Sequence, residues 1–150
     1  MKKLFFLLLT VCLVVACSKK DSLLTQGKAT FKINNISKEF IKVNSFNKGV
    51  LTLGNTKQEL ISISFPVPST FPRTYTIESN ELVIAAYTLN SKTYSATSGI
   101  LGVGRKGALS ITVTKYEDGK ISGTFSFTAI ADDATEIKIT NGVFTNIPDL

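Results

Sequence analysis

Histidine and tryptophan do not occur in this sequence of 150 residues, and cysteine occurs only twice. Without histidine the chain lacks the commonest general base and every Ser-His or Cys-His nucleophile pair. It also lacks the usual nitrogen and sulfur ligands for zinc or copper. Carboxylates, lysines, tyrosines and hydroxyls are the remaining groups for chemistry. We therefore expect a protein that is not an enzyme and that needs neither a metal nor another cofactor.

The first 16 residues have the organisation of a secretory signal. Lys2 and Lys3 are followed by an apolar run of 13 residues, Leu4 to Ala16, which only Thr10 interrupts. A helix that spans a bilayer needs about 20 apolar residues, so this run is too short to cross one. It has the length of the apolar region of a signal peptide. The sequence therefore predicts a cleaved signal peptide over residues 1–16.

The end of that run is more specific than an ordinary cleavage site. The stretch Val14-Val15-Ala16-Cys17 resembles the bacterial lipobox, in which the cysteine receives a diacylglyceryl group and becomes the first residue of the mature chain. The alternative is an ordinary signal peptide with a chance cysteine at its end. Two or more acyl chains anchor a protein stably, at about 0.8 kcal/mol per buried CH₂. We expect Cys17 to tether the protein to a membrane face without spanning it.

Residues 17–26 then form the lipidated cysteine and its tether, and residues 27–150 form one domain. The nine residues from Ser18 to Gln26 reach about 30 Å when fully extended. The mature chain of 134 residues, 17–150, is long enough to bury a hydrophobic core. It contains no second cysteine, so no disulfide forms within the domain.

Charge is mildly positive and evenly spread. Removing Lys2 and Lys3 from the 17 basic residues leaves an excess of four over the 11 acidic ones. No basic run after the signal is longer than Lys19-Lys20, and scattered charges of this kind are no footprint for nucleic acid. A weak basic excess does suit contact with anionic lipid headgroups.

Everything after Gln26 is typical of strands and turns. Threonine, serine and β-branched residues dominate, and apolar residues recur with a period of two. Strands are predicted within the segments 28–34, 40–46, 50–54, 59–65, 73–79, 81–96 and 108–129. The fold class is therefore all-β, an antiparallel β-sandwich of about 8–10 short strands. A small lipocalin-like barrel is the alternative, since short-turned hairpins suit it too.

Two hairpins can be assigned a register. A two-residue loop at Asn90-Ser91 sets Tyr87 opposite Tyr94 as a cross-strand aromatic pair. In the second hairpin, a two-residue loop at Asp118-Gly119 would put the apolar faces out of step. A three-residue loop, 117–119, brings the apolar residues of both strands back to the same face, with Gly119 in the left-handed position of a G1 bulge.

That three-residue loop sets Ile111 against Phe125 and Leu109 against Phe127. The other face of the hairpin is then predicted to be polar and exposed. It would carry Thr112, Thr114, Tyr116, Ser122, Thr124, Ser126 and Thr128.

Tyrosines are the candidate ligand-binding residues, because a ring with a polar tip suits stacking on a sugar or on a partner surface. The candidates are Tyr87, Tyr94 and Tyr116. The alternative for Tyr87 and Tyr94 is that they only stabilise their own hairpin.

Two further patterns have plain structural explanations. Residues 102–107, Gly-Val-Gly-Arg-Lys-Gly, match a dinucleotide-binding pattern, but a strand follows where a helix is required, which favours a glycine-rich turn. Asp132, Asp133 and Glu136 could hold Ca²⁺ through carboxylate oxygens, but without EF-hand spacing a solvated loop is favoured.

The lipobox, residues 27–34, residues 110–129 and residues 139–148 together resemble an uncharacterised family of small lipoproteins from Bacteroidota. That resemblance implies an all-β lipoprotein of the outer-membrane system, without a known activity. Acidic residues just after the lipidated cysteine favour surface export in that phylum. Ser18-Lys19-Lys20-Asp21 matches this only in part, so a surface and a periplasmic location both stay open.

The sequence thus predicts a lipid-anchored, non-enzymatic β-domain of the cell envelope that binds a glycan or a protein partner. A small barrel that carries a hydrophobic ligand or inhibits an enzyme is the alternative. A hydrolase with a carboxylate pair is a third hypothesis, which the absence of histidine disfavours.

Overall fold

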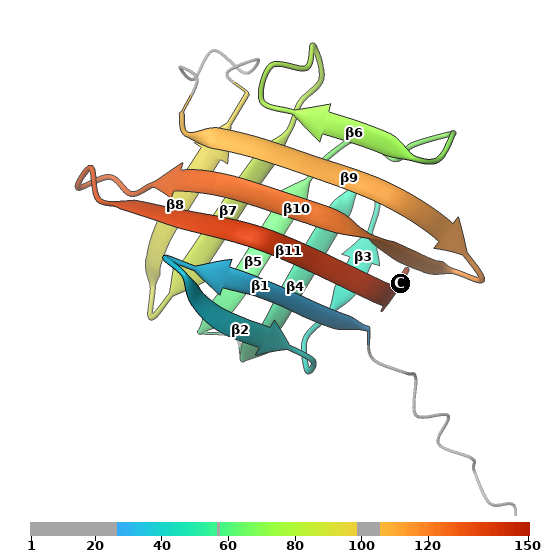
Figure 1. The fold of residues 1–150 in the computed structure, drawn as a ribbon, viewed down its shortest axis with the longest axis horizontal. Helices are drawn as coiled ribbons and strands as arrows, with labels where there is room; N and C mark the ends of the chain where they lie inside the picture. The colour runs from blue at the N-terminus through green and yellow to red at the C-terminus, as the bar shows by residue number, and fades with distance from the viewer. Residues whose placement is uncertain (1–26, 57, 99–105) are drawn as a thin grey trace, which may run out of the picture.

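The computed structural model describes residues 27–56, 58–98 and 106–150, and within them the chain forms strands and turns without a helix (Figure 1). In this described part no helical segment could cross a membrane. The strands are β1 Lys28–Ile33, β2 Ile36–Phe40, β3 Ser45–Asn47, β4 Val50–Thr56, β5 Glu59–Ser64, β6 Arg73–Thr76, β7 Ile84–Leu89, β8 Lys92–Thr97, β9 Ala108–Glu117, β10 Lys120–Ile130 and β11 Glu136–Pro148. The all-β prediction is confirmed. The predicted signal peptide and tether lie outside the described residues.

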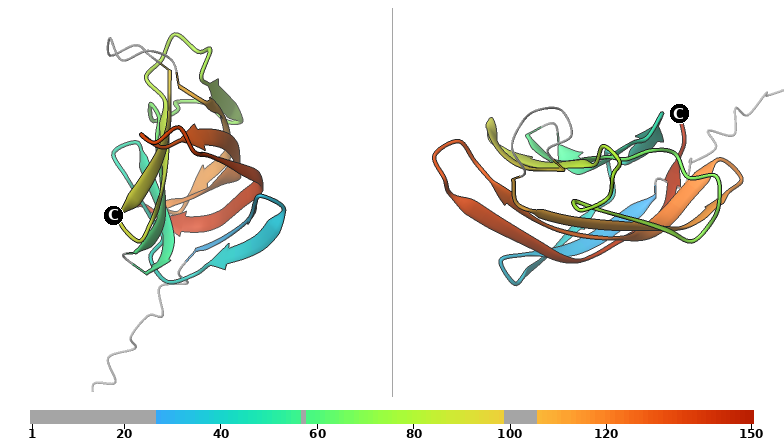
Figure 2. Two further views of the ribbon diagram at one scale, coloured as in Figure 1. Left: turned by 90° about the vertical axis from the view of Figure 1, so that its left-hand side faces the viewer. Right: turned by 90° about the horizontal axis from the view of Figure 1, so that it is seen from above.

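All of these strands belong to one antiparallel sheet that curls back on itself (Figure 2). One part, the front half, contains β6, β9, β10, β11, β1 and β2 in that order. The other part, the back half, contains β8, β7, β5, β4 and β3. The two halves face each other as the layers of a sandwich do, yet they remain one sheet as in an open barrel. The described residues contain 11 strands, slightly more than predicted.

The curled sheet is joined at both sides. On one side Ile130 of β10 pairs with Ser95 of β8. On the other side Phe46 of β3 forms a parallel bridge with Asp149, and the Leu150 amide donates to the Phe46 carbonyl over 2.9 Å. The first contact joins the two halves, and the second holds β3, at one end of the strand order, beside the residues that follow β11.

Polar side chains close the gap between β2 and β4. The Asn55 side chain donates to the Glu39 carbonyl over 2.7 Å and accepts from the Ile41 amide over 2.9 Å. Buried Asn44 donates to the Gly27 and Phe40 carbonyls and accepts from the Gly54 amide. These bonds satisfy backbone groups that the edge strands would otherwise leave unpaired.

The core lies between the two halves and is rich in aromatic rings. Inward residues alternate with outward ones along the strands, as a sheet with one buried face requires. The rings of Phe31 and Phe40 meet edge to face with centroids 4.8 Å apart, and Phe46 stacks on Phe65 at 5.6 Å. Offset and edge-to-face pairs of this kind stabilise by about 0.5–1.5 kcal/mol beyond burial.

The β7–β8 hairpin confirms its predicted register. Tyr87 pairs with Tyr94 and Leu89 with Lys92, so the loop is Asn90-Ser91. Both loop residues have positive φ, 48° and 71°, as a type I′ turn requires. The turn therefore matches the right-handed twist of its strands.

The β9–β10 hairpin has the predicted core register but a different turn. Ile111 pairs with Phe125 and Leu109 with Phe127, as expected. Glu117 pairs with Lys120, however, so the loop has two residues and not three. A bulge in β9 at Thr114 supplies the one-residue shift in pairing that the third loop residue was predicted to give. Lys115 pairs with Ser122 and Val113 pairs with Gly123, so the pairing skips Thr114.

This bulge changes the side on which Tyr116 lies. Tyr116 pairs with Ile121, whose side chain is buried, and directly paired residues point to the same side of a sheet. The prediction that Tyr116 belongs to the polar outer face is therefore wrong. A bulge reverses the alternation of every residue beyond it.

Candidate functional site

The outer face of the front half carries rows of hydroxyl side chains. Backbone pairing aligns Thr74 of β6 with Thr112 of β9 and Thr124 of β10. A second row runs from Thr76 through Ser110 to Ser126. We call this surface the hydroxyl face, and it consists of Thr74, Thr76, Ser110, Thr112, Thr124, Ser126, Thr128, Lys138 and Thr140.

The sheet holds these hydroxyls at fixed spacing. Thr74 and Thr112 are joined by a hydrogen bond of 2.8 Å between their hydroxyl oxygens. Neighbouring strands lie about 4.8 Å apart, and residues on the same face of a strand repeat about every 6.8 Å. The face therefore presents donors and acceptors as a regular grid.

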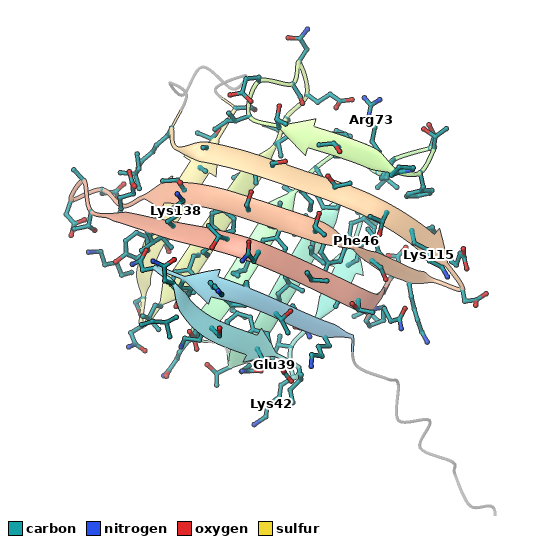
Figure 3. The ribbon with its side chains drawn as sticks, in the orientation of Figure 1. Glu39, Lys42, Phe46, Arg73, Lys115 and Lys138 are labelled. Carbon is teal, nitrogen blue, oxygen red and sulfur yellow. The ribbon has the colours of Figure 1, made fainter. Side chains whose placement is uncertain are left out.

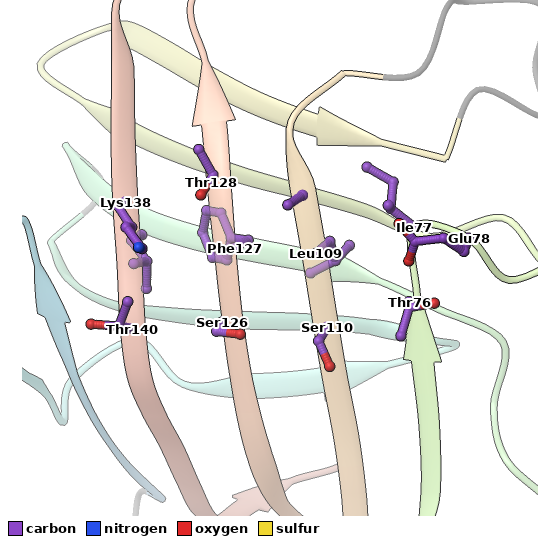
Figure 4. A pocket seen from close by; sticks show the side chains of 12 residues that line it. Thr76, Ile77, Glu78, Leu109, Ser110, Ser126, Phe127, Thr128, Lys138 and Thr140 are labelled. Carbon is purple, nitrogen blue, oxygen red and sulfur yellow. The ribbon is translucent and has the colours of Figure 1, made fainter.

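Three shallow depressions run together over this face. The first, of about 260 Å³, extends from Thr76 and Glu78 across β9 and β10 to Lys138 and Thr140 (Figure 4). The second, of about 310 Å³, shares Ser110 and Ser126 with the first and extends to Asn141. The third, of about 320 Å³, shares Lys138 and Thr140 with the first and reaches the β1–β2 turn at Asn34 and Asn35. Together they form a trough that crosses the strands.

Hydroxyl side chains line the trough together with apolar residues such as Leu109 and Phe127, and the trough carries charge at two places. Lys138 projects from β11 on the front of the molecule (Figure 3), and its backbone amide donates to the Asn34 side chain over 3.0 Å. Glu78 lies at the opposite end, beyond β6 (Figure 4). Val143, an exposed apolar residue, lines the second depression. The lining can therefore offer a ligand both hydrogen bonds and apolar contact.

Tyr87 and Tyr94 form their predicted pair away from the trough. Their ring centroids are 6.3 Å apart, and Tyr87 is only 3% exposed. The Tyr87 hydroxyl donates to Glu59 over 3.0 Å, and Lys38 donates to the same carboxylate oxygen over 3.0 Å. Burial is the main cause that raises the pKa of Tyr87, and the bond to Glu59 adds to it. The geometry places Tyr87 in the core, where it supports the sheet.

Tyr116 lies near the C-terminal end of β9, beside the loop between β5 and β6. Its ring stacks on Phe71 with centroids 6.3 Å apart, and its hydroxyl donates to Asp149 over 2.5 Å. That hydrogen bond raises the pKa of Tyr116. The three tyrosine candidates therefore do not converge on one site.

The acidic loop after β10 is engaged in ion pairs. Lys92 donates to Asp133 over 2.7 Å, and Thr135 donates to the same carboxylate over 2.6 Å. The bond from Lys92 is the largest cause that lowers the pKa of Asp133. Asp132 lies 3.8 Å from Lys106, and Glu136 begins β11. Within the described ranges no three His, Cys, Asp or Glu side chains gather closely enough to hold a metal ion.

Two sequence candidates fall wholly or largely beyond the described residues. Cys17, the predicted lipidation site, precedes Gly27, and most of the glycine-rich run 102–107 lies in the undescribed segment 99–105. Lys138, Thr140 and Thr76 were missed as site residues. Their alternation with Ile137, Ile139 and Tyr75 indicates outward side chains, but only long-range pairing puts them beside Ser126.

Fold and face together define a small all-β domain with a polar, trough-bearing sheet surface. A family model for a domain of unknown function, DUF6252, matches residues 37–148. The chain belongs to this family, so the predicted membership of an uncharacterised family is confirmed. The match begins within β2 and ends with β11. No curated protein and no solved structure matches the chain.

Proposed function

We propose that this protein is a lipid-anchored domain of the cell envelope that binds a hydroxyl-rich polymer, a glycan, along the hydroxyl face. Cys17 would carry the lipid and hold the domain on the outer membrane. The trough that crosses β9, β10 and β11 is the observation that carries the proposal.

The chemistry of the trough favours a glycan over a protein partner. Its hydroxyls, the Lys138 amine and the Asn141 amide match the donors and acceptors of a sugar chain. Protein interfaces have an apolar, aromatic centre. The rings that line this trough, Phe125 and Phe127, are each only 3% exposed. Because these rings are buried, each sugar unit gains little from stacking, and affinity must come from many units bound together.

A binding role without catalysis suits the side chains. The chain has no histidine, and Asp133, the carboxylate with the most strongly lowered pKa, is held by Lys92 and Thr135 in an exposed loop. A general acid needs a raised carboxyl pKa in a cleft. The alternative function, transport of a hydrophobic ligand, requires an apolar cavity between the halves, where rings such as Phe125, Phe127 and Phe144 pack instead.

Affinity electrophoresis of the purified chain in gels that contain neutral or acidic polysaccharides tests this proposal. Ser126→Arg places a bulky side chain in the first and second depressions, and Thr93→Arg introduces arginine on the exposed surface of β8 as a control. We expect Ser126→Arg to weaken binding at least about tenfold, which is about 1.4 kcal/mol. Thr93→Arg should bind like the unchanged protein.

Two results would contradict the glycan proposal. One is retardation by none of the polysaccharides, in which case a protein partner takes precedence. The other is equal binding by Ser126→Arg and Thr93→Arg, which would place the contact away from the hydroxyl face.

A further inference from the structure

One end of the molecule carries a group of exposed apolar side chains that the hydroxyl face does not use. Val67 and Phe71 lie in the loop between β5 and β6, and they are 58% and 38% exposed. Tyr116, whose ring stacks on Phe71, and the C-terminal Leu150 are exposed as well. We call these four residues the tether-end cluster. Large apolar side chains grouped in this way mark a surface that meets something apolar.

Contacts between three separate segments assemble this cluster. The Tyr116 ring stacks on Phe71, and the Tyr116 hydroxyl bonds Asp149. The Leu150 amide bonds the Phe46 carbonyl, and Phe46 stacks on Phe65, where the loop that holds Val67 begins. The cluster is therefore fixed to the sheet and presented by it.

The cluster lies at the end where the described chain begins. Gly27 sits against Ile147 in the last strand, and its carbonyl accepts from Asn44. Figure 1 shows the start of β1, the C-terminal end of β11 and the β9–β10 turn at the same side of the molecule. The exposed apolar residues Ile36, which begins β2, and Leu89, which ends β7, lie beside turns at the opposite side.

We infer that the tether-end cluster rests in the interfacial layer of the membrane to which Cys17 is anchored, so that the domain has one fixed orientation. This inference rests on the proposed lipid anchor. Nine residues separate Cys17 from Gly27, a reach of about 30 Å. The end with Gly27 is therefore kept close to the headgroups, while β10, with 11 residues, extends about 37 Å away from it.

The composition of this end suits a lipid interface. Phe71 and Tyr116 offer an apolar ring and a ring with a polar tip, the pair that interfacial layers favour. Lys48 is exposed in the β3–β4 turn, and Lys115, which is exposed next to Tyr116 (Figure 3), forms an ion pair with Glu117 over 2.8 Å. The Lys48 ammonium can meet anionic headgroups while the rings enter the layer beneath.

In this orientation the hydroxyl face stands on the side of the domain, perpendicular to the membrane. Its threonines and serines follow one another along β9 and β10, and these strands lead away from the tether end. A polymer that crosses these strands in the trough would then run parallel to the membrane surface. The cluster thus adds a positioning role to the proposed binding role.

Single-cysteine labelling in native membranes tests the inference. The sequence has only Cys12, in the signal, and Cys17, whose thiol would carry lipid, so an introduced cysteine is the one free thiol. Val67→Cys is compared with Ile36→Cys, an exposed β-branched residue at the far end. Phe71→Cys with Leu89→Cys is a second pair. Each is labelled with a polarity-sensitive fluorophore and exposed to a lipid-soluble nitroxide.

We expect labels at positions 67 and 71 to be quenched at least twofold more than those at 36 and 89, with emission shifted to the blue. Equal quenching at both ends, with the protein still in the membrane fraction, would overturn the inference and leave the anchor intact. Labels at 67 and 71 that resist both the nitroxide and aqueous iodide would show a protein cover instead of lipid, and would also overturn it. Loss of the protein to the soluble fraction would refute the anchor itself.

Discussion

The hairpins β7–β8 and β9–β10 turn in the same way but place their tyrosines in opposite surroundings. Both have two-residue loops whose residues have positive φ. The first keeps one register throughout, so Tyr87 stays inside with the core. The second skips one residue at Thr114, and Tyr116 ends on an exposed edge against Phe71. A single bulge therefore separates a tyrosine that stabilises the fold from one that is free to meet a surface.

Truncation of the two tyrosines should show this difference with the largest effect. Tyr87→Ala leaves a cavity between the halves and removes the hydrogen bond to Glu59, so we expect a loss of about 4 kcal/mol in the free energy of unfolding. Tyr116→Ala should lose only a small fraction of that. Urea unfolding followed by circular dichroism measures both, and similar losses would contradict the assigned environments.

Replacing each of two glycines in the β9–β10 hairpin by alanine should give the next largest difference in stability. A Cβ on Gly123 would lie 2.1 Å from the Thr112 carbonyl and 2.6 Å from the Phe144 ring, and the backbone cannot move aside cheaply. Gly123→Ala should therefore cost about 3 kcal/mol. At Gly119 nothing lies within 4 Å, and only the positive φ of 65° opposes a side chain. Gly119→Ala should cost about 1 kcal/mol, and a larger loss than at Gly123 would refute the bulged packing.

Alkaline pH should distinguish the two tyrosines again, with a moderate effect. Burial raises the folded-state pKa of Tyr87 above its unfolded value of 10.0. Stability from this group is therefore complete below pH 10, and it falls as the pH rises toward the folded pKa, because only the unfolded chain releases the proton. In absorbance titration at high pH, Tyr87 should ionise after Tyr116. Tyr87→Phe should remove the last phase, whereas removal of an earlier phase would contradict the burial of Tyr87.

The smallest effect should come from the ion pair that links the β7–β8 turn to the loop after β10. The bond from Lys92 lowers the folded-state pKa of Asp133 below its unfolded value of 3.8. Its stabilisation is present above pH 3.8 and is lost as the pH falls through the lowered folded pKa. Asp133→Asn should reduce Tm slightly at pH 7. The difference in Tm between this variant and the unchanged protein should become smaller below pH 3.8. Asp132→Asn, in the same loop but 3.8 Å from Lys106, is the control and should change Tm less. A difference in Tm that widens in acid would contradict this pairing.

The parts of the fold that local chemistry decides could be predicted from the sequence. Alternating apolar residues indicated the strands, and Asn90-Ser91 indicated its turn, because a type I′ loop needs residues that accept positive φ. The pairing of Ile111 with Phe125 followed from the need to bury both.

The bulge could not be predicted, because two local structures have the same effect on register. The pairing shifts by one residue in either case: with a three-residue loop at 117–119, or with a two-residue loop and a bulge at Thr114 in the strand before it. They agree on the core and differ only beyond the bulge. Tyr116 lies in that stretch, which is why its side of the sheet was misassigned.

Long-range contacts explain the other departures. The predicted strand 40–46 is interrupted because Asn44 turns inward to bond Phe40 and two residues farther away in the sequence, Gly27 and Gly54. The same holds for the trough. Its hydroxyls on β9 and β10 were predicted, but Thr76 and Thr140 join them only through the order of strands in the sheet.

The central claim is that Cys17 anchors this domain to the outer membrane. Fractionation of cells that express the tagged chain or its Cys17→Ala variant, with protease added to intact cells, tests it most directly. We predict that the unchanged protein sediments with the outer membrane and that Cys17→Ala is released. Digestion on intact cells would place the domain on the surface, and protection until the membrane is opened would place it in the periplasm. A Cys17→Ala variant that stays in the membrane fraction would contradict the anchor.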